Sequence, residues 1–164
     1  MDQSVIGVIF DEKRRSVLLI QRRDVPVWVI PGGGLEEGEK PEAGVIREVL
    51  EETGFSAEII RKVGEYSPLN RMARFTHLFE CRIVTGEATL SDESKAVKFF
   101  PLNALPKLLP PPYKEWIQEA YQNGPLIQRT LTSVNYRTLF KYFLLHPLLV
   151  GRFILSKIGL TINT

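Results

Sequence analysis

The N-terminal part of the chain alternates between short apolar runs and turn-forming residues, a pattern typical of short β-strands. The runs are rich in β-branched and aliphatic residues, and most are closed by glycine, proline or charged residues. Those that predict strands lie at residues 4–10, 16–21, 25–30, 56–66, 75–84 and 97–102. Because only the turn-like segment 11–15 separates the first two runs, we expect them to form a hairpin.

Two segments have the spacing and the boundary residues of helices. Good helix formers follow Pro41, and Thr53-Gly54 ends the segment, which predicts a helix over Pro41–Thr53. A second helix is expected at 113–121, where aromatic and aliphatic residues recur at helical spacing after the breaker at 110–112. Strands with one helix among them and one after them predict a mixed sheet flanked by helices.

The composition is that of an ordinary globular protein. The chain has 164 residues, 44% hydrophobic and 24% charged, which fits one domain and argues against disorder, collagen and coiled coil. The single cysteine, Cys81, excludes an internal disulfide and a cysteine-based metal cluster, so we expect a reducing, cytoplasmic location. No uninterrupted apolar run reaches the roughly 18 residues of a membrane-spanning helix.

Negative charge is concentrated in one short stretch of the sequence. Between residues 36 and 52 lie seven glutamates against only Lys40 and Arg47, a local balance of −5 in a chain whose net charge is +2. The rest of the chain therefore carries +7. An acidic cluster within a mildly basic protein indicates a cation site that serves an anionic substrate.

Three of these glutamates fall on one face of the predicted helix. Glu48, Glu51 and Glu52 stand at i, i+3 and i+4, so their carboxylates project together. Carboxylate oxygens with water and substrate phosphate are the ligands that Mg²⁺ prefers. Upstream, the glycines 32–34 allow the backbone to approach a ligand closely and to offer a carbonyl. Taken alone, such glutamates are more often a solvated helix face.

The glycines and the glutamates stand in one fixed register, however. The segment follows the pattern Gly33-x5-Glu39-x7-Arg47-Glu48-Val49-Leu50-Glu51-Glu52-Thr53-Gly54-Phe55, which resembles a complete Nudix box. The resemblance extends over about residues 5–121. It implies an α/β/α sandwich with a mixed β-sheet. It also implies hydrolysis of nucleoside diphosphates linked to another group, by attack of water at phosphorus with Mg²⁺ or Mn²⁺.

The resemblance further implies a set of metal ligands and a set of catalytic residues. The expected metal ligands are the carboxylates of Glu48, Glu51 and Glu52 and the backbone carbonyl of Gly32. A further carboxylate is expected from Glu93, with Asp92 as the second choice. The expected catalytic residues are Glu52, Glu51, Glu93 and Arg47, with Glu52 or Glu51 favoured as the general base and Glu93 third.

Other residues of the box are expected to support the loop. Glu39 and Arg47 should pair and hold the loop to the helix, and Gly33 and Gly54 should shape the turns at its two ends. Gly44 departs from the helix former that is usual at its position. A glycine inside a helix costs about 0.5–1 kcal/mol, which indicates close packing against a strand.

Basic and aromatic residues near the box are candidates for substrate binding. Arg22, Arg23 and Arg74 are expected to bind phosphates, and Trp28 to stack on a base. Each has a structural alternative: a surface salt bridge for the arginines, and packing under the loop for Trp28.

The C-terminal residues 125–164 extend beyond the expected Nudix domain at 1–124. They are basic and apolar, with no acidic residue from Ala120 onward and apolar runs at 139–145 and 148–158 split by His146-Pro147. We favour a pair of helices packed on the domain or on the partner of a homodimer. The alternative is peripheral contact with anionic lipid, which the scattered charges of the second run disfavour.

The function predicted from the sequence is Mg²⁺-dependent cleavage of a pyrophosphate bond in a small nucleotide derivative. A rival hypothesis is a nucleotide-sensing Nudix-like binding module without turnover; such modules commonly lose catalytic glutamates, which are intact here. The apolar tail does not favour a nucleic-acid partner.

Overall fold

The computed structural model of the protein describes residues 2–71, 73–145, 147, 148 and 151, whose strands form two sheets. The larger sheet consists, in spatial order, of β4 (Gly32–Gly34), β1 (Gln3–Ile9), β6 (Phe75–Gly86), β5 (Phe55–Pro68) and β8 (Ile127–Leu131). The smaller sheet consists of β3 (Trp28–Val29), β2 (Ser16–Arg22) and β7 (Ser94–Pro101). The larger sheet is mixed: β1–β6 and β5–β8 are parallel pairs, whereas β1–β4 and β5–β6 are antiparallel.

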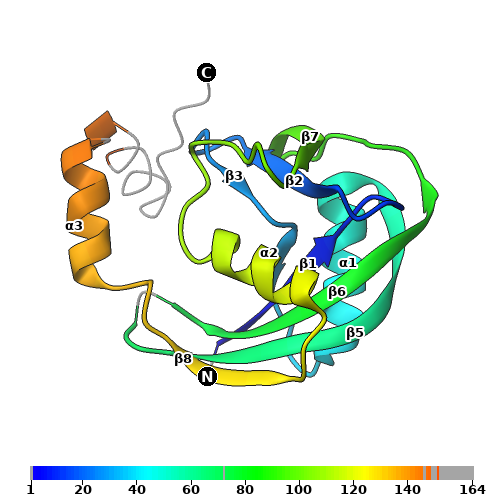
Figure 1. The fold of residues 1–164 in the computed structure, drawn as a ribbon, viewed down its shortest axis with the longest axis horizontal. Helices are drawn as coiled ribbons and strands as arrows, with labels where there is room; N and C mark the ends of the chain where they lie inside the picture. Colours follow the sequence, from blue (N-terminus) through cyan, green and yellow to red (C-terminus); the bar gives the residue numbers. More distant parts are fainter. Residues whose placement is uncertain (1, 72, 146, 149–150, 152–164) are drawn as a thin grey trace.

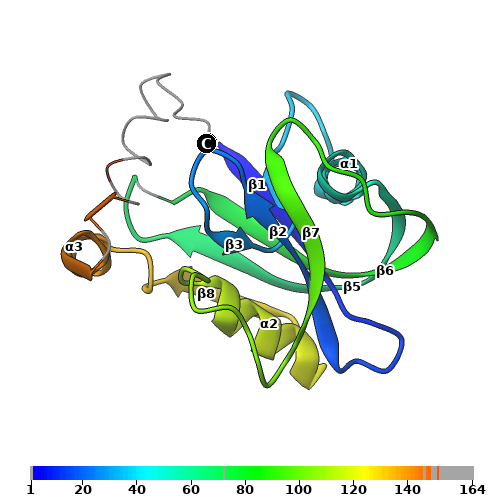
Figure 2. The ribbon, with the colours of Figure 1, turned by 90° about the horizontal axis from the view of Figure 1, so that it is seen from above.

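Two helices cover opposite faces of these strands. They are α1 (Pro41–Thr53) and α2 (Tyr113–Gln122), which Figure 2 shows on either side of β1 and β6. Successive side chains of a strand point to opposite faces, so Val5 of β1 packs in the core cluster that includes α1. Its neighbour Ile6 packs in the cluster that includes α2. The fold is therefore the α/β/α sandwich with a mixed sheet that the sequence predicted.

Helix α1 has the bounds that its local sequence predicted. Pro41 occupies the first turn, where its missing N–H would have no helical partner. At the other end Gly54 adopts the left-handed conformation with φ 78°, and its N–H donates to the Leu50 carbonyl at 2.9 Å. A Cβ at Gly54 would lie 2.6 Å from the Glu87 carbonyl oxygen, so glycine is required there by both conformation and space.

The expected hairpin between the first two strands is wrong. β1 pairs with β4 and β6, β2 pairs with β3 and β7, and only an isolated bridge between Phe10 and Val17 joins the two strands. The connecting turn forms as expected, because the Asp11 carboxylate accepts the N–H groups of Arg15 at 2.6 Å and Ser16 at 3.2 Å. Both hydrogen-bonding edges of β1 are occupied by other strands, so β2 continues into the smaller sheet.

Two strands lie where none was predicted, and one predicted strand is shorter than expected. Only Trp28–Val29 of the segment 25–30 is extended in the smaller sheet. The three glycines after it are themselves a strand, β4, paired with β1. Strand β8 lies within the residues assigned to the C-terminal extension and pairs in parallel with β5, from Gly64–Ile127 to Pro68–Leu131.

The rest of the C-terminal extension is partly described. Helix α3 (Tyr136–Leu145) covers the first predicted apolar run, whereas most of the second run, 148–158, lies outside the described residues. Strand β8 is tied to α2, because Arg129 donates to Glu115 at 3.0 Å and to Glu119 at 2.8 Å. No helix in the described part of the chain is long and apolar enough to cross a membrane.

A buried charge network attaches α2 to the central strand. The Glu80 carboxylate of β6 is almost fully buried and accepts hydrogen bonds from Arg14 and Arg61. Both guanidinium groups also donate to the Ala120 carbonyl near the C-terminal end of α2, at 3.3 and 2.9 Å. The last turn of α2 contains no basic residue, so these two arginines supply the positive charge that a helix C-terminus favours.

Candidate functional site

The site is built where α1 faces the glycine strand β4. A Cβ on Gly32 would lie 2.9 Å from the Ile6 Cα, so only glycine allows β4 to approach β1 this closely. A Cβ on Gly33 would lie 2.5 Å from a Glu48 carboxylate oxygen. The backbone of β4 therefore lies directly against a carboxylate of α1, and a side chain at Gly33 would displace this carboxylate.

Glu52 is fixed by the same strand. Its Oε2 accepts the Gly32 N–H at 2.7 Å, and the residue is only 9% exposed. Burial raises the pKa of Glu52 to about 8, and the nearby negative charges of Glu48 and Glu93 contribute in the same direction. Without a bound cation, this carboxyl group therefore holds a proton near neutral pH.

Arg47 connects the loop before α1 to the glutamates on α1. Its Nε and Nη2 donate to the two carboxylate oxygens of Glu39 at 2.8 and 2.9 Å, so the expected pair is present and bidentate. Its Nη1 donates to Glu48 at 3.0 Å and to Glu51 at 3.1 Å, and Nη2 also donates to the Gly34 carbonyl at 3.1 Å. The pKa of Glu39 is lowered to about 2 by the hydrogen bonds from Arg47.

The helix carboxylates differ in their surroundings. The Glu48 side chain is 13% exposed, and burial raises its pKa despite the hydrogen bond from Arg47. The Glu51 side chain is 58% exposed and contacts a single guanidinium nitrogen of Arg47. Glu52 is the most buried of the three. The three carboxylates on this helix face therefore differ in solvent exposure, from exposed Glu51 to buried Glu52.

Glu93 reaches the site from the loop before β7. Its negative charge raises the pKa of both Glu48 and Glu52, which places it on the same side of the molecule as the helix glutamates. Two serines brace the loop: the Ser91 hydroxyl accepts the Glu93 N–H at 3.3 Å, and the buried Ser94 hydroxyl accepts the Ser91 N–H at 2.9 Å. The sequence prediction missed these serines, although the spacing Ser-x-x-Ser around Glu93 is a visible signal of such a turn.

The structure places the substrate-binding candidates in different environments. Arg22 forms a bidentate pair with Asp24, at 2.9 and 2.6 Å, and its positive charge acts on Glu52. The Arg74 guanidinium lies over β4, 2.8 Å from the position that a Gly34 Cβ would occupy. Trp28 packs edge to face on Phe100 of β7, with ring centroids 4.6 Å apart, and borders the core.

Arg23 is engaged by the Glu93 loop. Its backbone N–H donates to the Glu93 carbonyl at 2.9 Å, and its Nη2 donates to the carbonyls of Ser91 at 3.4 Å and Ser94 at 3.1 Å. Its Nε is buried and has no hydrogen-bond partner within the described residues. Arg23 therefore braces the loop that carries Glu93.

The donor set fits a hard divalent cation. Glu48 and Glu52 of one helix face lie against the β4 backbone and the charge of Glu93 acts on both, and oxygen ligands are those that Mg²⁺ and Mn²⁺ prefer. Glu52 is buried with a hydrogen bond to one N–H, so its carboxylate has lone pairs that a cation can satisfy. Within the described ranges no three such side chains are already arranged as a metal-binding group. Arg47 occupies oxygens of Glu48 and Glu51 in this structure.

Comparison with known proteins identifies the family and the fold. The NUDIX domain model matches residues 2–122. A putative 8-oxo-dGTP diphosphatase of Bacillus subtilis is 33% identical over 123 residues, which cover 74% of this chain and 80% of the relative. The chain belongs to the Nudix family. It is a Nudix pyrophosphohydrolase, an enzyme that acts on phosphoanhydride bonds.

Two further Nudix proteins are similar to this chain, one in sequence over a shorter segment and one in structure. An ADP-ribose pyrophosphatase of Methanocaldococcus jannaschii is 38% identical over 111 residues, which span 64% of each chain and so less than two thirds of the relative. The crystal structure of an ADP-ribose pyrophosphatase from Streptococcus suis superposes with a TM-score of 0.65 at 25% identity. It covers 79% of this chain and 98% of that structure.

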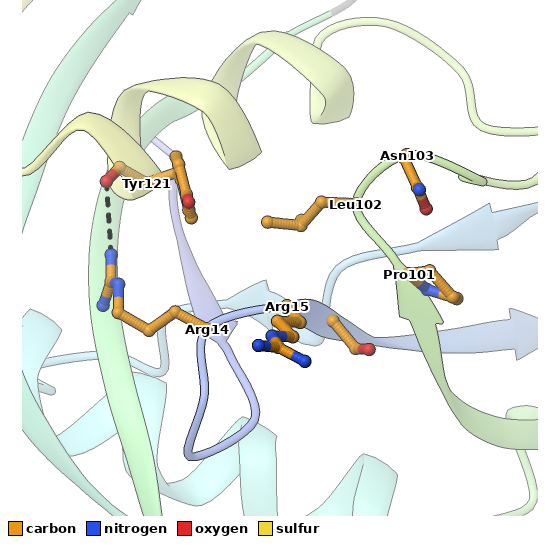
Figure 3. Close-up of a pocket in the computed structure, with 7 residues that line it drawn as sticks. Arg14, Arg15, Pro101, Leu102, Asn103 and Tyr121 are labelled. Carbon is orange, nitrogen blue, oxygen red and sulfur yellow. Dashed lines mark hydrogen bonds between the residues drawn. The ribbon is translucent and has the colours of Figure 1, made fainter.

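A pocket of about 460 Å³ lies elsewhere on the Nudix domain, as Figure 3 shows. The β1–β2 turn, the segment after β7 and the end of α2 line it, through Arg14, Arg15, Ser16, Pro101, Leu102, Asn103 and Tyr121. Ser16 begins β2, whereas Arg22, which acts on Glu52, ends it. The pocket is therefore at the opposite end of β2 from the glutamates, and it contributes no residue to the site.

The raised pKa of Glu52 predicts a pH-dependent stability of the metal-free protein. The folded state keeps the Glu52 proton up to about pH 8, whereas the unfolded chain loses it near 4.5, so stability falls as the pH rises between these values. We expect a loss on the order of 5 kcal/mol at most from Glu52. Thermal unfolding with a chelator across this range measures it. Glu52→Gln should flatten the dependence and the exposed control Glu42→Gln should not; equal slopes in all three proteins contradict the prediction.

Arg23 is predicted to act through Glu93. Arg23→Gln and Glu93→Gln should each lower kcat by roughly tenfold or more, and the double variant should be no slower than the slower single variant, because both changes remove the same positioned carboxylate. The measurement is a double-mutant cycle on the substrate that the wild type cleaves fastest. If instead the two substitutions lower kcat/KM independently, so that their effects multiply, and Arg23→Gln changes only KM, then Arg23 binds phosphate.

Proposed function

We propose that this Nudix enzyme cleaves, with Mg²⁺ or Mn²⁺, a pyrophosphate bond in a nucleoside diphosphate linked to another group. The observation that carries the proposal is the hydrogen bond from the Gly32 N–H to Glu52. It joins the carboxylate-bearing helix α1 to the β4 backbone, which supports a cation site at this junction.

The metal is proposed to bind through Glu48, Glu51 and Glu52 and the Gly32 carbonyl. When bound, a divalent cation neutralises the phosphate charge that repels a nucleophile and lowers the pKa of a coordinated water. Arg47 must then yield oxygens of Glu48 and Glu51 while keeping its bidentate grip on Glu39. Arg47 is thus proposed to position the carboxylates without contacting the substrate.

A carboxylate near the attacking water is proposed to take up its proton. Glu52 is our first candidate because burial raises its pKa to about 8, so its deprotonated carboxylate is a stronger base than an exposed one. The structure adds Glu48, whose pKa is also raised by burial, to the sequence-based candidates Glu51 and Glu93. Gln variants of all four, compared in turnover and in Mn²⁺ affinity, separate the base from the metal ligands, because loss of the base alone lowers turnover without weakening Mn²⁺ binding.

The substrate phosphates are proposed to meet Arg22 and Arg74. The Arg22 charge acts on Glu52, so Arg22 is the candidate nearer the carboxylates, whereas Arg74 lies against Gly34, on the face of β4 opposite to Gly33 and Glu48. Trp28 packs against Phe100 and is not included. Two relatives are named for 8-oxo-dGTP and ADP-ribose, and both names describe cleavage of a nucleotide diphosphate linkage. This shared chemistry supports the substrate class proposed here.

Glu52→Gln is predicted to lower turnover by at least about a hundredfold while the protein stays folded, because a proton acceptor and a metal ligand are lost. Glu42→Gln, on the exposed first turn of the same helix, should keep near wild-type turnover. The assay is a panel containing ADP-ribose, 8-oxo-dGTP and nucleotide sugars with Mg²⁺ or Mn²⁺, with products separated by chromatography. Near-normal turnover by Glu52→Gln would remove Glu52 from the mechanism. Nucleotide binding without cleavage of any compound would favour the sensing module.

A further inference from the structure

Helix α3 leaves the body of the protein after a firmly anchored start. Val134 packs against the core cluster on the α2 side, and the Asn70 side-chain amide donates to its carbonyl at 3.1 Å. The Asn135 side chain then caps the helix, since its Oδ1 accepts the Thr138 N–H at 2.9 Å. The direction of α3 is therefore set by the domain, whereas the rest of the helix lies away from the sheets (Figure 1).

One face of α3 is apolar and uncovered by the described residues. Tyr136, Phe140 and Leu144 are 66%, 63% and 64% exposed. They stand at i, i+4 and i+8, so they form one ridge along the helix, with successive side chains about 40° apart. Leu148, shortly after the end of α3, is 83% exposed. An exposed apolar ridge of this kind normally marks a contact surface.

A basic row runs beside the apolar ridge. Arg137 and Lys141 lie about 100° and 140° around the helix from Tyr136. They lie between Leu144 at about 80° and the exposed Leu145 at about 180°. Both are exposed, and neither forms an ion pair with a residue that the structure describes. The sequence contains no acidic residue from Ala120 to its end. Neighbouring positions along the chain therefore offer these charges no partner.

We propose that the apolar ridge and basic row of α3 dock this protein on an anionic lipid surface. Helices that bind membrane surfaces carry aromatic and aliphatic residues on one side and Lys or Arg beside them. The apolar side chains insert at the boundary between headgroups and acyl chains, and the basic side chains contact lipid phosphates. A second copy fits less well, because pairing two such ridges brings their basic rows together. Figures 1 and 2 place α3 and α1 at opposite ends of the molecule, so docking leaves the α1 glutamates accessible.

The test is co-sedimentation of the full chain with phosphatidylcholine vesicles, with and without phosphatidylglycerol. We expect binding to the anionic vesicles and little binding to phosphatidylcholine alone. Phe140→Ser with Leu144→Ser should weaken binding by at least about tenfold, because the buried apolar contact is lost. Arg137→Gln with Lys141→Gln should weaken it by roughly tenfold or more, since each basic residue near the surface contributes to binding.

Matched controls separate this surface from general effects. Val84→Ser removes an apolar side chain of similar exposure on β6, and Lys13→Gln with Arg15→Gln removes two exposed charges from the β1–β2 turn. Both should bind vesicles like the wild type. Unchanged hydrolase activity and thermal unfolding verify that each variant is folded.

Three results would overturn the proposal. The first is no binding of the wild type to anionic vesicles, or equal binding to both vesicle types. The second is binding that survives the α3 substitutions, which would assign it to residues outside α3. The third is a wild-type dimer that Phe140→Ser with Leu144→Ser dissociates in light scattering while vesicle binding is absent, which would make a second copy the occupant.

Discussion

The hydrogen bond between the Gly32 N–H and the Glu52 carboxylate is the contact on which the arrangement of the site depends. This hydrogen bond joins strand β4 to helix α1. Only glycine residues allow β4 to lie this close to β1, and the acidic face of α1 is thereby held in a fixed position. The remaining contacts extend this junction: Arg47 clamps Glu39 to the helix, and the serine-braced loop brings Glu93 to the same side. The site is therefore formed by the junction between β4 and α1, together with the loop that carries Glu93.

Clustering carboxylates on one helix is unfavourable for an isolated helix, and the fold offsets this cost in two ways. Val45 and Val49 are fully buried against β1, so α1 is held by apolar packing rather than by its own propensity. The Arg47 guanidinium neutralises part of the cluster, at the expense of occupying oxygens that a cation would use. Gly44 fits the same design, because a Cβ there would lie 3.0 Å from a Glu39 oxygen. Its close neighbours are loop residues, whereas the sequence suggested a strand.

The parts of the structure that the sequence predicted are those determined by local chemistry. Pro41 and Gly54 mark both ends of α1 because each requires a particular backbone at its own position. The triplet of glycines gave no strand signal, since glycine has a low intrinsic preference for strands and β4 depends on pairing with the distant β1. β8 was missed for the same reason, because its partner β5 lies far earlier in the chain. Within the site, helical spacing predicted which glutamates share a face, but the commitment of Arg23 to the Glu93 loop required the three-dimensional structure.

The most direct test of the strand–helix junction as a metal centre is the location of Mn²⁺ by anomalous diffraction from crystals grown with the ion. A single strong peak within coordination distance of the Glu52 carboxylate and the Gly32 carbonyl, with Glu48 or Glu51 released from Arg47, is the predicted result. A peak remote from α1, or none at these carboxylates in a well-ordered crystal, would contradict the assignment of this face as the catalytic metal site.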